Sequence, residues 1–516
     1  MDKEARRRRE KIYLKILRET GTTYVGTIIG LLIGYANVVL ITRFVTPGHY
    51  GVYSLGLTIT GLVMMLATLS LNEALVRFIP RYRAQGRQEA VRDLVKVCFT
   101  GSLLAGILLL VLVMALAGPV ATRVFHKEEL AGVLRLFSLS IPLLLLSFQV
   151  GHAFMGFQEM RYAVYLNRIF LPLGQLVLLL VFFRLGYRLY GLVGAYCLST
   201  FGTALIALYY LSRRLVPMLP AGGGRCDRKE VFQYAYPLLG NRLLVFLLNG
   251  CIDILFLGYF LGSADVGIYK VAQLSVQPLA LVMFSFALIG KPVLAELIAR
   301  EQWHEVREIY RRITKWILCL NVPLFVALGC FGRHILTVFF TEKFTGGESA
   351  MLLLALGFVL NALCGPEGKA LDAAGRTRLL FLNAACAFLL NVVLSCLLIP
   401  RLGLDGGAVA VSGALVLQGS LGLGQLVHYH RVHPFSSRLA RTLVAGALLF
   451  EVARRLAGLV PMNLFGLAAA VLVVFLSWGV LVLLFRVLDR TDWEILGRLR
   501  RTVEGKARDI SDVIFR

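Results

Sequence analysis

The sequence predicts an all-α polytopic membrane protein with about 14 transmembrane helices. Of its 516 residues, 58% are hydrophobic and 16% are charged, whereas about a quarter of the residues in a soluble chain are charged. The charges gather between apolar runs of about 20 residues, the length of a helix that crosses the hydrocarbon core. An internal repeat is the third observation. It predicts two parallel six-helix lobes around a central cavity, followed by two C-terminal helices.

The apolar runs place the helices one after another along the chain. The predicted spans are residues 22–45, 51–76, 94–116, 133–156, 162–183, 190–211, 238–260, 266–289, 313–332, 349–371, 379–399, 407–427, 438–453 and 464–485. The thirteenth is the shortest, and Arg441 and Arg454 lie close to its ends. An even number of spans puts both termini on the same side of the membrane.

The basic residues predict which side each connection faces. The net charge is +24. Segments on the side of the two termini carry 36 of the 54 Lys and Arg residues, and the alternate segments carry 9. Short cationic segments resist translocation, so the richer side is expected to be the cytoplasm. We therefore expect a multi-pass protein of the cytoplasmic (inner) membrane with both termini in the cytoplasm. No soluble basic module is present, so no nucleic acid is expected as a partner.

The internal repeat has an offset of 216 residues. Residues 44–53, FVTPGHYGVY, align without gaps on residues 260–269, FLGSADVGIY, and the same offset places Asn37 on Asp253. Six spans separate equivalent helices, so both copies cross the membrane in the same direction. The predicted parts are a basic cytoplasmic N-terminal segment (1–20), an N-terminal lobe (21–212), a cytoplasmic inter-lobe linker (213–230), a C-terminal lobe (231–430), appended helices 13 and 14 (431–487) and a basic cytoplasmic tail (488–516).

The composition of the linker predicts a flexible, non-helical connection, because it contains Pro217, Pro220 and three consecutive glycines. Such a connection suits two bodies that move against each other. A simple surface loop is equally compatible with it.

Several classes of function lack their motifs in this sequence. There is no G-x-x-x-x-G-K-[ST], H-E-x-x-H or G-x-S-x-G, and the predicted loops are short. The chain is therefore expected not to be an enzyme and to hold no cofactor or metal. Its nine cysteines have no metal-binding spacing and are expected to be reduced, buried thiols.

Ionisable side chains inside the spans mark the candidate site, because each costs about 2.5–3.5 kcal/mol near the centre of a membrane helix. In the seventh span Arg242, Asn249 and Asp253 lie 7 and 4 residues apart, which predicts one shared helix face. Arg242 and Asp253 would be about 16 Å apart along the axis and could not pair. Each therefore needs another partner or a hydrated cavity.

The eighth span offers Lys270, Gln273 and Gln277, spaced by 3 and 4 residues on another single face. Because this helix runs inward from the outer side, Lys270 is expected at the depth of Asp253. The sequence therefore predicts a contact between Asp253 and Lys270. Arg43, near the outer end of the first span, is a competing partner.

The inner half of the candidate site is predicted from the second span, where Glu73 and Arg77 lie four residues apart at a depth similar to that of Arg242. Two interpretations are open. These polar side chains line a cavity, or they pair between helices and only stabilise the bundle.

Several ordered motifs resemble those of a known transporter family. Besides residues 44–53, they are DILFLGYFLG at 253–262, PVLAE at 292–296, LDAAGR at 371–376, IPRLG at 399–403 and GGA at 406–408. The sequence is similar here to the polysaccharide transporter family, the Wzx-type flippases of the multidrug/oligosaccharidyl-lipid/polysaccharide flippase superfamily. The resemblance covers roughly residues 20–430.

The resemblance implies a flippase that moves a lipid-linked oligosaccharide, on a polyprenyl phosphate or pyrophosphate, from the inner to the outer leaflet by alternating access. Membrane lipids, and glycosyltransferases or a polymerase of the same pathway, are the implied partners. Arg43, Arg77, Arg242 and Lys270 would attract the phosphate; Asn249, Gln273 and Gln277 would bind sugar hydroxyls. Asp253 and Glu73 would set the charge of the cavity or couple transport to protons or sodium.

Other functions remain open at this point. A MATE-like ion-coupled exporter would take cationic substrates, which a positively charged cavity disfavours. A peptidoglycan-precursor flippase would be needed for viability. A membrane glycosyltransferase or ligase would need a long extracytoplasmic loop, and a scramblase would move lipids without discrimination.

Overall fold

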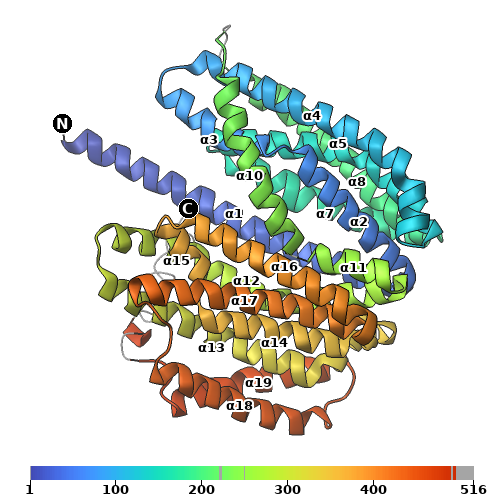
Figure 1. Cartoon of the computed structure of the whole chain (residues 1–516), viewed down its shortest axis with the longest axis vertical. Coiled ribbons are helices and arrows are strands. Elements are labelled where there is room, and N and C mark those ends of the chain that lie inside the picture. The colour runs from blue at the N-terminus through green and yellow to red at the C-terminus, as the bar shows by residue number, and fades with distance from the viewer. Residues whose placement is uncertain (1, 220–223, 249, 490–491, 495–516) are drawn as a thin grey trace, which may run out of the picture. The chain divides into compact units, whose positions relative to one another are not determined.

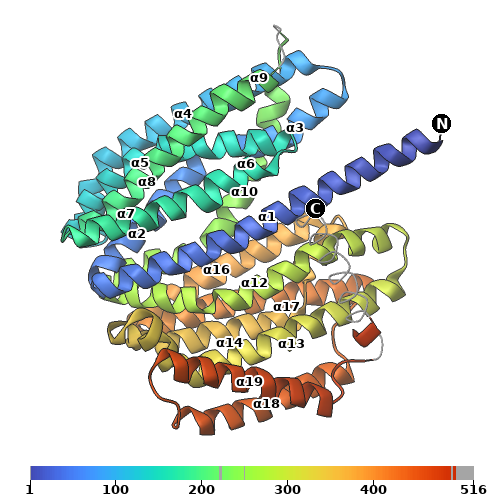
Figure 2. The ribbon, with the colours of Figure 1, turned by 180° about the vertical axis from the view of Figure 1, so that it is seen from behind.

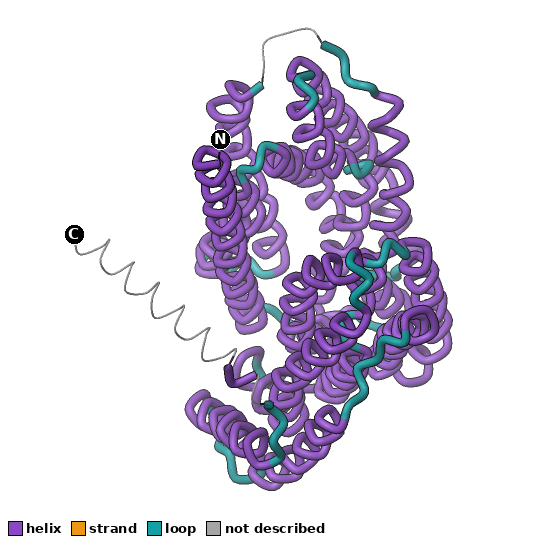
Figure 3. The backbone as a smooth tube through the Cα atoms, turned by 90° about the vertical axis from the view of Figure 1, so that its left-hand side faces the viewer, coloured by secondary structure: helices purple, strands orange, loops and turns teal. Residues whose placement is uncertain are grey.

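The computed structural model describes residues 2–219, 224–248, 250–489 and 492–494, and this part of the chain consists of helices joined by loops and turns (Figures 1 and 3). No strand occurs among these residues. The α-helices are α1 (Asp2–Phe44), α2 (Pro47–Ala67), α3 (Leu71–Ala84), α4 (Gln88–Pro119), α5 (Glu128–Gly156), α6 (Met160–Val164), α7 (Leu171–Arg184), α8 (Leu189–Tyr210), α9 (Val216–Met218), α10 (Arg228–Leu248), α11 (Ile252–Phe260), α12 (Ser263–Ala299), α13 (Trp303–Ile335), α14 (Glu348–Cys364), α15 (Glu367–Ala373), α16 (Thr377–Leu402), α17 (Leu404–His430), α18 (Ser437–Ala457) and α19 (Leu464–Leu484).

Five shorter helical segments complete the described chain. Four are π-helical turns, η1 (Val120–Val124), η2 (Tyr165–Phe170), η3 (Leu211–Leu215) and η4 (Leu336–Phe340), and one is a 3-10 helix, η5 (Glu342–Gly347). Within the described residues, thirteen helices are long and apolar enough to cross a membrane. The prediction of an all-α polytopic membrane protein is thereby confirmed.

The thirteenth predicted span is α18, which has the length of a span but is not among those thirteen helices. It carries five charged residues, Arg438, Arg441, Glu451, Arg454 and Arg455, all near its two ends. The stretch between them is apolar, and its buried face packs against α13 and α19.

The chain divides into two compact units, which are described separately. Unit 1 contains residues 1–274, 339–350 and 387–411, and unit 2 contains residues 275–338, 351–386 and 412–516. In unit 1, α5 packs against α2, α4 and α8, and α1 lies along α7 (Figure 2). Leu75, Phe78, Leu94 and Phe154 belong to its buried apolar core. In unit 2, α13 packs against α18 and α19.

The 216-residue offset reappears in the boundaries of the helices. α1 ends at Phe44 and α11 at Phe260, and α2 begins at Pro47 as α12 begins at Ser263. The π-helical turns η1 and η4 have the same offset over their whole length. Equivalent residues therefore adopt equivalent backbone structure far from the loop in which the repeat was noticed.

Three predicted spans are broken, and the prediction that each is one helix is wrong. The tenth is divided into α14 and α15, with Gly365 at φ +78°. The second is divided into α2 and α3, with Leu69 and Ser70 at φ +49° and +53°. The seventh is divided into α10 and α11, with Gly250 at φ +90°. Arg242 and Asp253 therefore lie on different helices. The argument for one shared face fails, because helical periodicity holds only along an unbroken helix.

The linker is less free than its composition predicted. η3 and α9 continue α8 as far as Met218, so its first part is helical rather than irregular. Its last part is held against the start of α4: the Cys226 amide donates to Asp93 Oδ2 at 3.0 Å, and Arg228 lies 3.7 Å from Asp93 Oδ1. Pro220 lies outside the described residues.

Candidate functional site

An ion pair joins Glu73 and Arg242, two of the residues that the sequence singled out. Arg242 Nη2 on α10 lies 2.5 Å from Glu73 Oε1 on α3. His152 Nε2 on α5 lies 3.8 Å from the same oxygen, and Asn72 Nδ2 donates to it at 3.4 Å. We call these four residues the Glu73 cluster. It brings an anion, a cation and a titratable imidazole together between three helices of unit 1.

The break between α2 and α3 lies in a second group of polar side chains. The Ser70 amide donates to Thr68 Oγ1 at 3.3 Å. Ser102 Oγ donates to the Thr68 carbonyl at 3.3 Å and accepts from Gln149 Nε2 at 2.5 Å. All four residues are buried. These bonds satisfy polar groups that an unbroken helix would have paired internally, and they hold α3 where Glu73 meets Arg242.

Asp253, Gln273 and Lys270 form a chain of hydrogen bonds, which we call the Asp253 cluster. Lys270 Nζ donates to Gln273 Oε1 at 2.8 Å, and Gln273 Nε2 donates to Asp253 Oδ2 at 3.1 Å. The structure thus brings Asp253 and Lys270 together as the sequence suggested, with a glutamine amide between them. Asp253 is fully buried, and its Oδ1 has no hydrogen-bond partner among the described residues.

The break between α10 and α11 lies directly against this cluster. A Cβ atom on Gly250 would lie 3.0 Å from Gln273 Cδ, so a larger residue here would displace the Gln273 amide. Gly250 also has φ +90°, which favours glycine independently. Because of this break, α11 begins close to Gln273, and Asp253 in its first turn accepts the hydrogen bond from Gln273.

The other predicted site residues lie outside both clusters. Arg77 is exposed, and its guanidinium carbon lies 4.2 Å from the centroid of the Tyr234 ring. Arg43 and Gln277 are exposed, and Gln277 belongs to unit 2. Asn249 lies outside the described residues.

The candidate cations differ in whether a carboxylate counter-ion lies beside them. Arg242 has the carboxylate of Glu73 as counter-ion. Among the described residues no carboxylate oxygen lies within 4.0 Å of Lys270 Nζ or of the Arg77 guanidinium nitrogens. A cation without a counter-ion in an apolar bundle attracts an anion strongly. The amide of Gln273 can in addition donate to hydroxyl groups. Among the described residues no group of three or more His, Cys, Asp and Glu side chains is arranged to hold a metal ion.

His152, in the Glu73 cluster, and the buried Glu367 were not predicted from the sequence as candidate site residues. His152 follows a run of apolar residues and carries no charge pattern, so only its position reveals its contact with Glu73. Glu367 is 7% exposed, and its Oε2 has no partner among the described residues. The Gly365-Pro366 pair before it, which separates α14 from α15, was the available signal.

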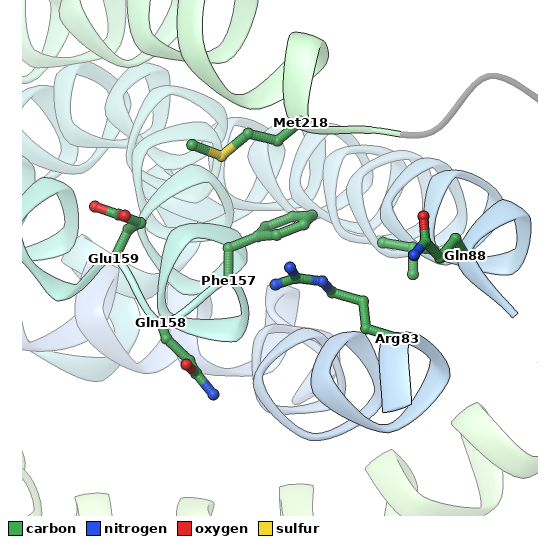
Figure 4. Close-up of a pocket in the computed structure, with 7 residues that line it drawn as sticks. Arg83, Gln88, Phe157, Gln158, Glu159 and Met218 are labelled. Atoms are coloured by element: carbon green, nitrogen blue, oxygen red, sulfur yellow. The ribbon is translucent and has the colours of Figure 1, made fainter. Parts of the chain in front are cut away.

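A separate pocket of about 380 Å³ lies in unit 1 at the connections between helices (Figure 4). Arg83 and Gln88 line it from the α3–α4 connection, Gln158 and Glu159 from the α5–α6 turn, and Met218 from α9. The Arg83 guanidinium lies over the Phe157 ring, 5.4 Å from its centroid. None of the residues predicted for the site lines this pocket.

Two family models match the chain. The one described as "Polysaccharide biosynthesis protein" matches residues 16–297, more than half of the sequence. A second, described as MatE, matches residues 237–397.

Similar proteins include two archaeal sequences and one solved structure. An uncharacterized membrane protein of Methanocaldococcus jannaschii, MJ1068, is 23% identical over 73% of this chain and 77% of its own length. The "Probable low-salt glycan biosynthesis flippase Agl15" of Haloferax volcanii is 23% identical over 36% of this chain and 38% of its own. The solved structure "Lipid II flippase MurJ, inward closed conformation" has a TM-score of 0.69 and 14% identity, and covers 91% of this chain and 99% of its own.

Proposed function

Because the chain belongs to the polysaccharide biosynthesis protein family, we propose that it is a flippase for a lipid-linked oligosaccharide. It would move a glycan carried on a polyprenyl phosphate or pyrophosphate from the inner to the outer leaflet, for the synthesis of cell-surface polysaccharide. The Wzx-type resemblance noted in the sequence agrees with this family.

The observation that carries the proposal is the pair of polar clusters inside unit 1. Each charge in hydrocarbon costs free energy. Among the described residues Lys270 has no carboxylate counter-ion and Arg242 has one, so a polar substrate would account for the presence of both cations. A phosphate or pyrophosphate group offers these cations a multiply charged acceptor. Sugar hydroxyls offer the amide of Gln273 partners to bind, and Gln277 and Asn249 are the further amides that the sequence proposes for this role.

Arg242 would bind the headgroup by exchanging its partner. In the structure Glu73 neutralises it at 2.5 Å. A pyrophosphate carries more charge than one carboxylate and presents oxygens that match the planar guanidinium. Binding would therefore release the Glu73 carboxylate, which would still lie beside His152. Arg77 and Arg43 would attract the headgroup, and Asp253, joined to Lys270 through Gln273, would set the charge of the cavity.

The distribution of basic residues supports a topology for this activity. The α3–α4 connection, the linker and the two termini together carry 25 of the 54 Lys and Arg residues, so they would face the cytoplasm of an inner membrane. The ends of unit 1 at residues 45–47, 125–127 and 261–263 would face outside. The lobes 21–212 and 231–430 would alternate between inward- and outward-facing arrangements.

Substitution of the cations tests the proposal. In a strain that lacks the gene, we expect Arg242→Ala and Lys270→Ala to lower surface glycan about tenfold or more at wild-type protein level, the effect of losing about 1.4 kcal/mol of binding. Lys291→Ala is the matched control on α12, because its ammonium pairs with Asp372 at 2.6 Å and lies outside both clusters. Normal surface glycan in both cation variants would remove them from the mechanism.

Depletion of the protein separates the remaining alternatives. Loss of surface glycan in viable cells supports the proposal, whereas lysis would indicate a peptidoglycan-precursor flippase. Uptake of a cationic dye into vesicles against a proton or sodium gradient would indicate an ion-coupled exporter.

A further inference from the structure

Two glycines that are equivalent in the repeat face each other in unit 1. Gly51 lies in the first turns of α2 and Gly267 in those of α12, 216 residues later. A Cβ atom on Gly51 would fall on the Ser263 carbonyl and lie 3.0 Å from the Gly267 nitrogen. A Cβ atom on Gly267 would fall on the Pro47 carbonyl and lie 3.0 Å from the Gly51 nitrogen. We call Pro47, Gly51, Ser263 and Gly267 the seam.

The contact at the seam is reciprocal, because Pro47 and Ser263 are themselves 216 residues apart. Each half of the repeat places a helix-start carbonyl against the glycine of the other half. The two backbones touch with no side chain between them, as small residues allow in membrane bundles. Nothing larger than glycine fits at either position while this contact exists.

Lys127 joins the two halves at the same end of unit 1. It lies between η1 and α5 in the first half, and its Nζ donates to Gly258 O at 2.5 Å and Leu261 O at 3.0 Å in the second half. It also donates to its own neighbour Phe125 O at 3.2 Å. Gly258 and Leu261 lie at the C-terminus of α11, where carbonyls lack donors within the helix and a cation is favoured.

Partial burial of the Lys127 ammonium has a desolvation cost that full exposure to water would avoid. Burial lowers the pKa of Lys127 below its ordinary value, and the charge of Asp265 opposes that shift. Lys127 is partly buried, and its amine donates to three carbonyl acceptors at this position.

The second half of the repeat lacks this device. The residue 216 positions after Lys127 is Lys343, in η5, and it is exposed. The same residue type at the equivalent position thus makes a bond across the halves in one copy only, which gives Lys127 a matched control.

We propose that the seam is the outer closure of the transport passage and that Lys127 is the latch that keeps it shut. The inference rests on the proposed function, which places this end of unit 1 outside the membrane. Opening to the outside separates α2 from the start of α12 and releases Lys127 from α11. Lys127 acts as a positioning residue, since it favours the closed arrangement without touching the substrate.

Cys251 is a native reporter of the opening. It is 3% exposed and lies at the break between α10 and α11, two residues before Asp253. A membrane-impermeant maleimide added outside right-side-out vesicles should reach it only when the outer end is open. The modified peptide is quantified by mass spectrometry in the full chain.

The expected result is side-specific. Lys127→Ala should raise the labelling rate of Cys251 from outside about tenfold or more, as expected when charge-assisted hydrogen bonds worth about 1.4 kcal/mol or more are lost from the closed state. Lys127→Arg should retain slow labelling, because arginine keeps the charge and the donors. Lys343→Ala should label at the wild-type rate.

Several outcomes would overturn the latch. These are unchanged labelling in Lys127→Ala, an equal rise in Lys343→Ala, or a rise seen only in inside-out vesicles. Because labelling needs no substrate, its outcome is independent of the surface-glycan assay. A failure of the proposed function with normal side-specific labelling would therefore be recognised as such. Gly267→Ala, which prevents the backbone contact, should raise labelling in the same direction as Lys127→Ala.

Discussion

At the scale of single residues, Glu73 and Arg242 show how two opposite charges are paired inside a membrane bundle. Each side chain is partly exposed, 22% for Glu73 and 39% for Arg242, so neither is fully enclosed by the other helices. The carboxylate accepts from Arg242 and Asn72 and lies near His152. Such an ion pair can exchange partners without leaving an isolated charge, which a fully buried pair cannot do.

A double substitution distinguishes a structural pair from a binding residue. Glu73→Ala and Arg242→Ala should each lower stability by about 1–3 kcal/mol, and the double variant should recover about 1 kcal/mol of the sum, because no unpaired charge remains. Thermal unfolding in detergent measures this. If Arg242 binds the headgroup, surface glycan should stay low in the double variant. Recovery of both stability and glycan would instead identify the pair as purely structural.

The residues of the clusters were only partly predictable. Charge within apolar runs pointed to Glu73, Arg242, Asp253 and Lys270, because the cost of an ion in hydrocarbon can be read from the sequence. The partners of these four side chains could not be predicted, because they depend on which helices are in contact. His152 and Lys127 looked like ordinary helix and loop residues, and only the folded chain shows their acceptors.

At the scale of elements, the membrane makes helix lengths predictable and leaves helix breaks hard to find. Apolar runs placed every span, because a helix must cross a fixed thickness. The break at Gly250 had a glycine as its signal. The break at Thr68–Ser70 contains neither Gly nor Pro, and it is held by Ser102 and by the unusual φ of Leu69 and Ser70. Tertiary contacts rather than local sequence decide it.

Ser70 offers a direct test of this second break. It has φ +53°, is fully buried, and its hydroxyl has no partner among the described residues. Ser70→Gly should raise stability by about 1 kcal/mol, because glycine adopts the left-handed region without strain and leaves no unpaired hydroxyl. Ser70→Ala removes the hydroxyl but keeps the strain, so it should be the less stable of the two in thermal unfolding. The reverse order would show that α2 and α3 are continuous in the membrane.

At the scale of the whole chain, α18 decides how the polypeptide is threaded. It runs beside α13 in the same direction: Gly446 lies against Val322, Phe450 against Gly329, and His334 Nε2 is 3.1 Å from the Val460 carbonyl. α19 returns, and after it Asp492 forms an ion pair with Lys315 near the start of α13. We therefore expect α18 to cross the same thickness as α13, despite the charges at its ends.

The side of the membrane on which each terminus lies therefore follows from α18. If it crosses, there are fourteen spans, and epitope tags at the N- and C-termini should both resist a protease added outside intact cells. Both should be digested after the cells are opened. If only the C-terminal tag is digested from outside, α18 does not cross, and the positive-inside assignment of the C-terminal half is wrong.

The reciprocal contact of Gly51 and Gly267 has a consequence for the origin of the molecule. In a two-fold homodimer, if one residue of the first subunit contacts a different residue of the second, the same contact also forms with the two subunits exchanged. Pro47 with Gly267 and Ser263 with Gly51 satisfy this condition inside one polypeptide. An ancestor of half the present length could thus have assembled from two identical chains, and joining its gene in tandem would have preserved the junction. Lys127 and Lys343 would then show how the two halves diverged. After fusion one lysine could form the bond between the halves, and the equivalent lysine was no longer needed for it.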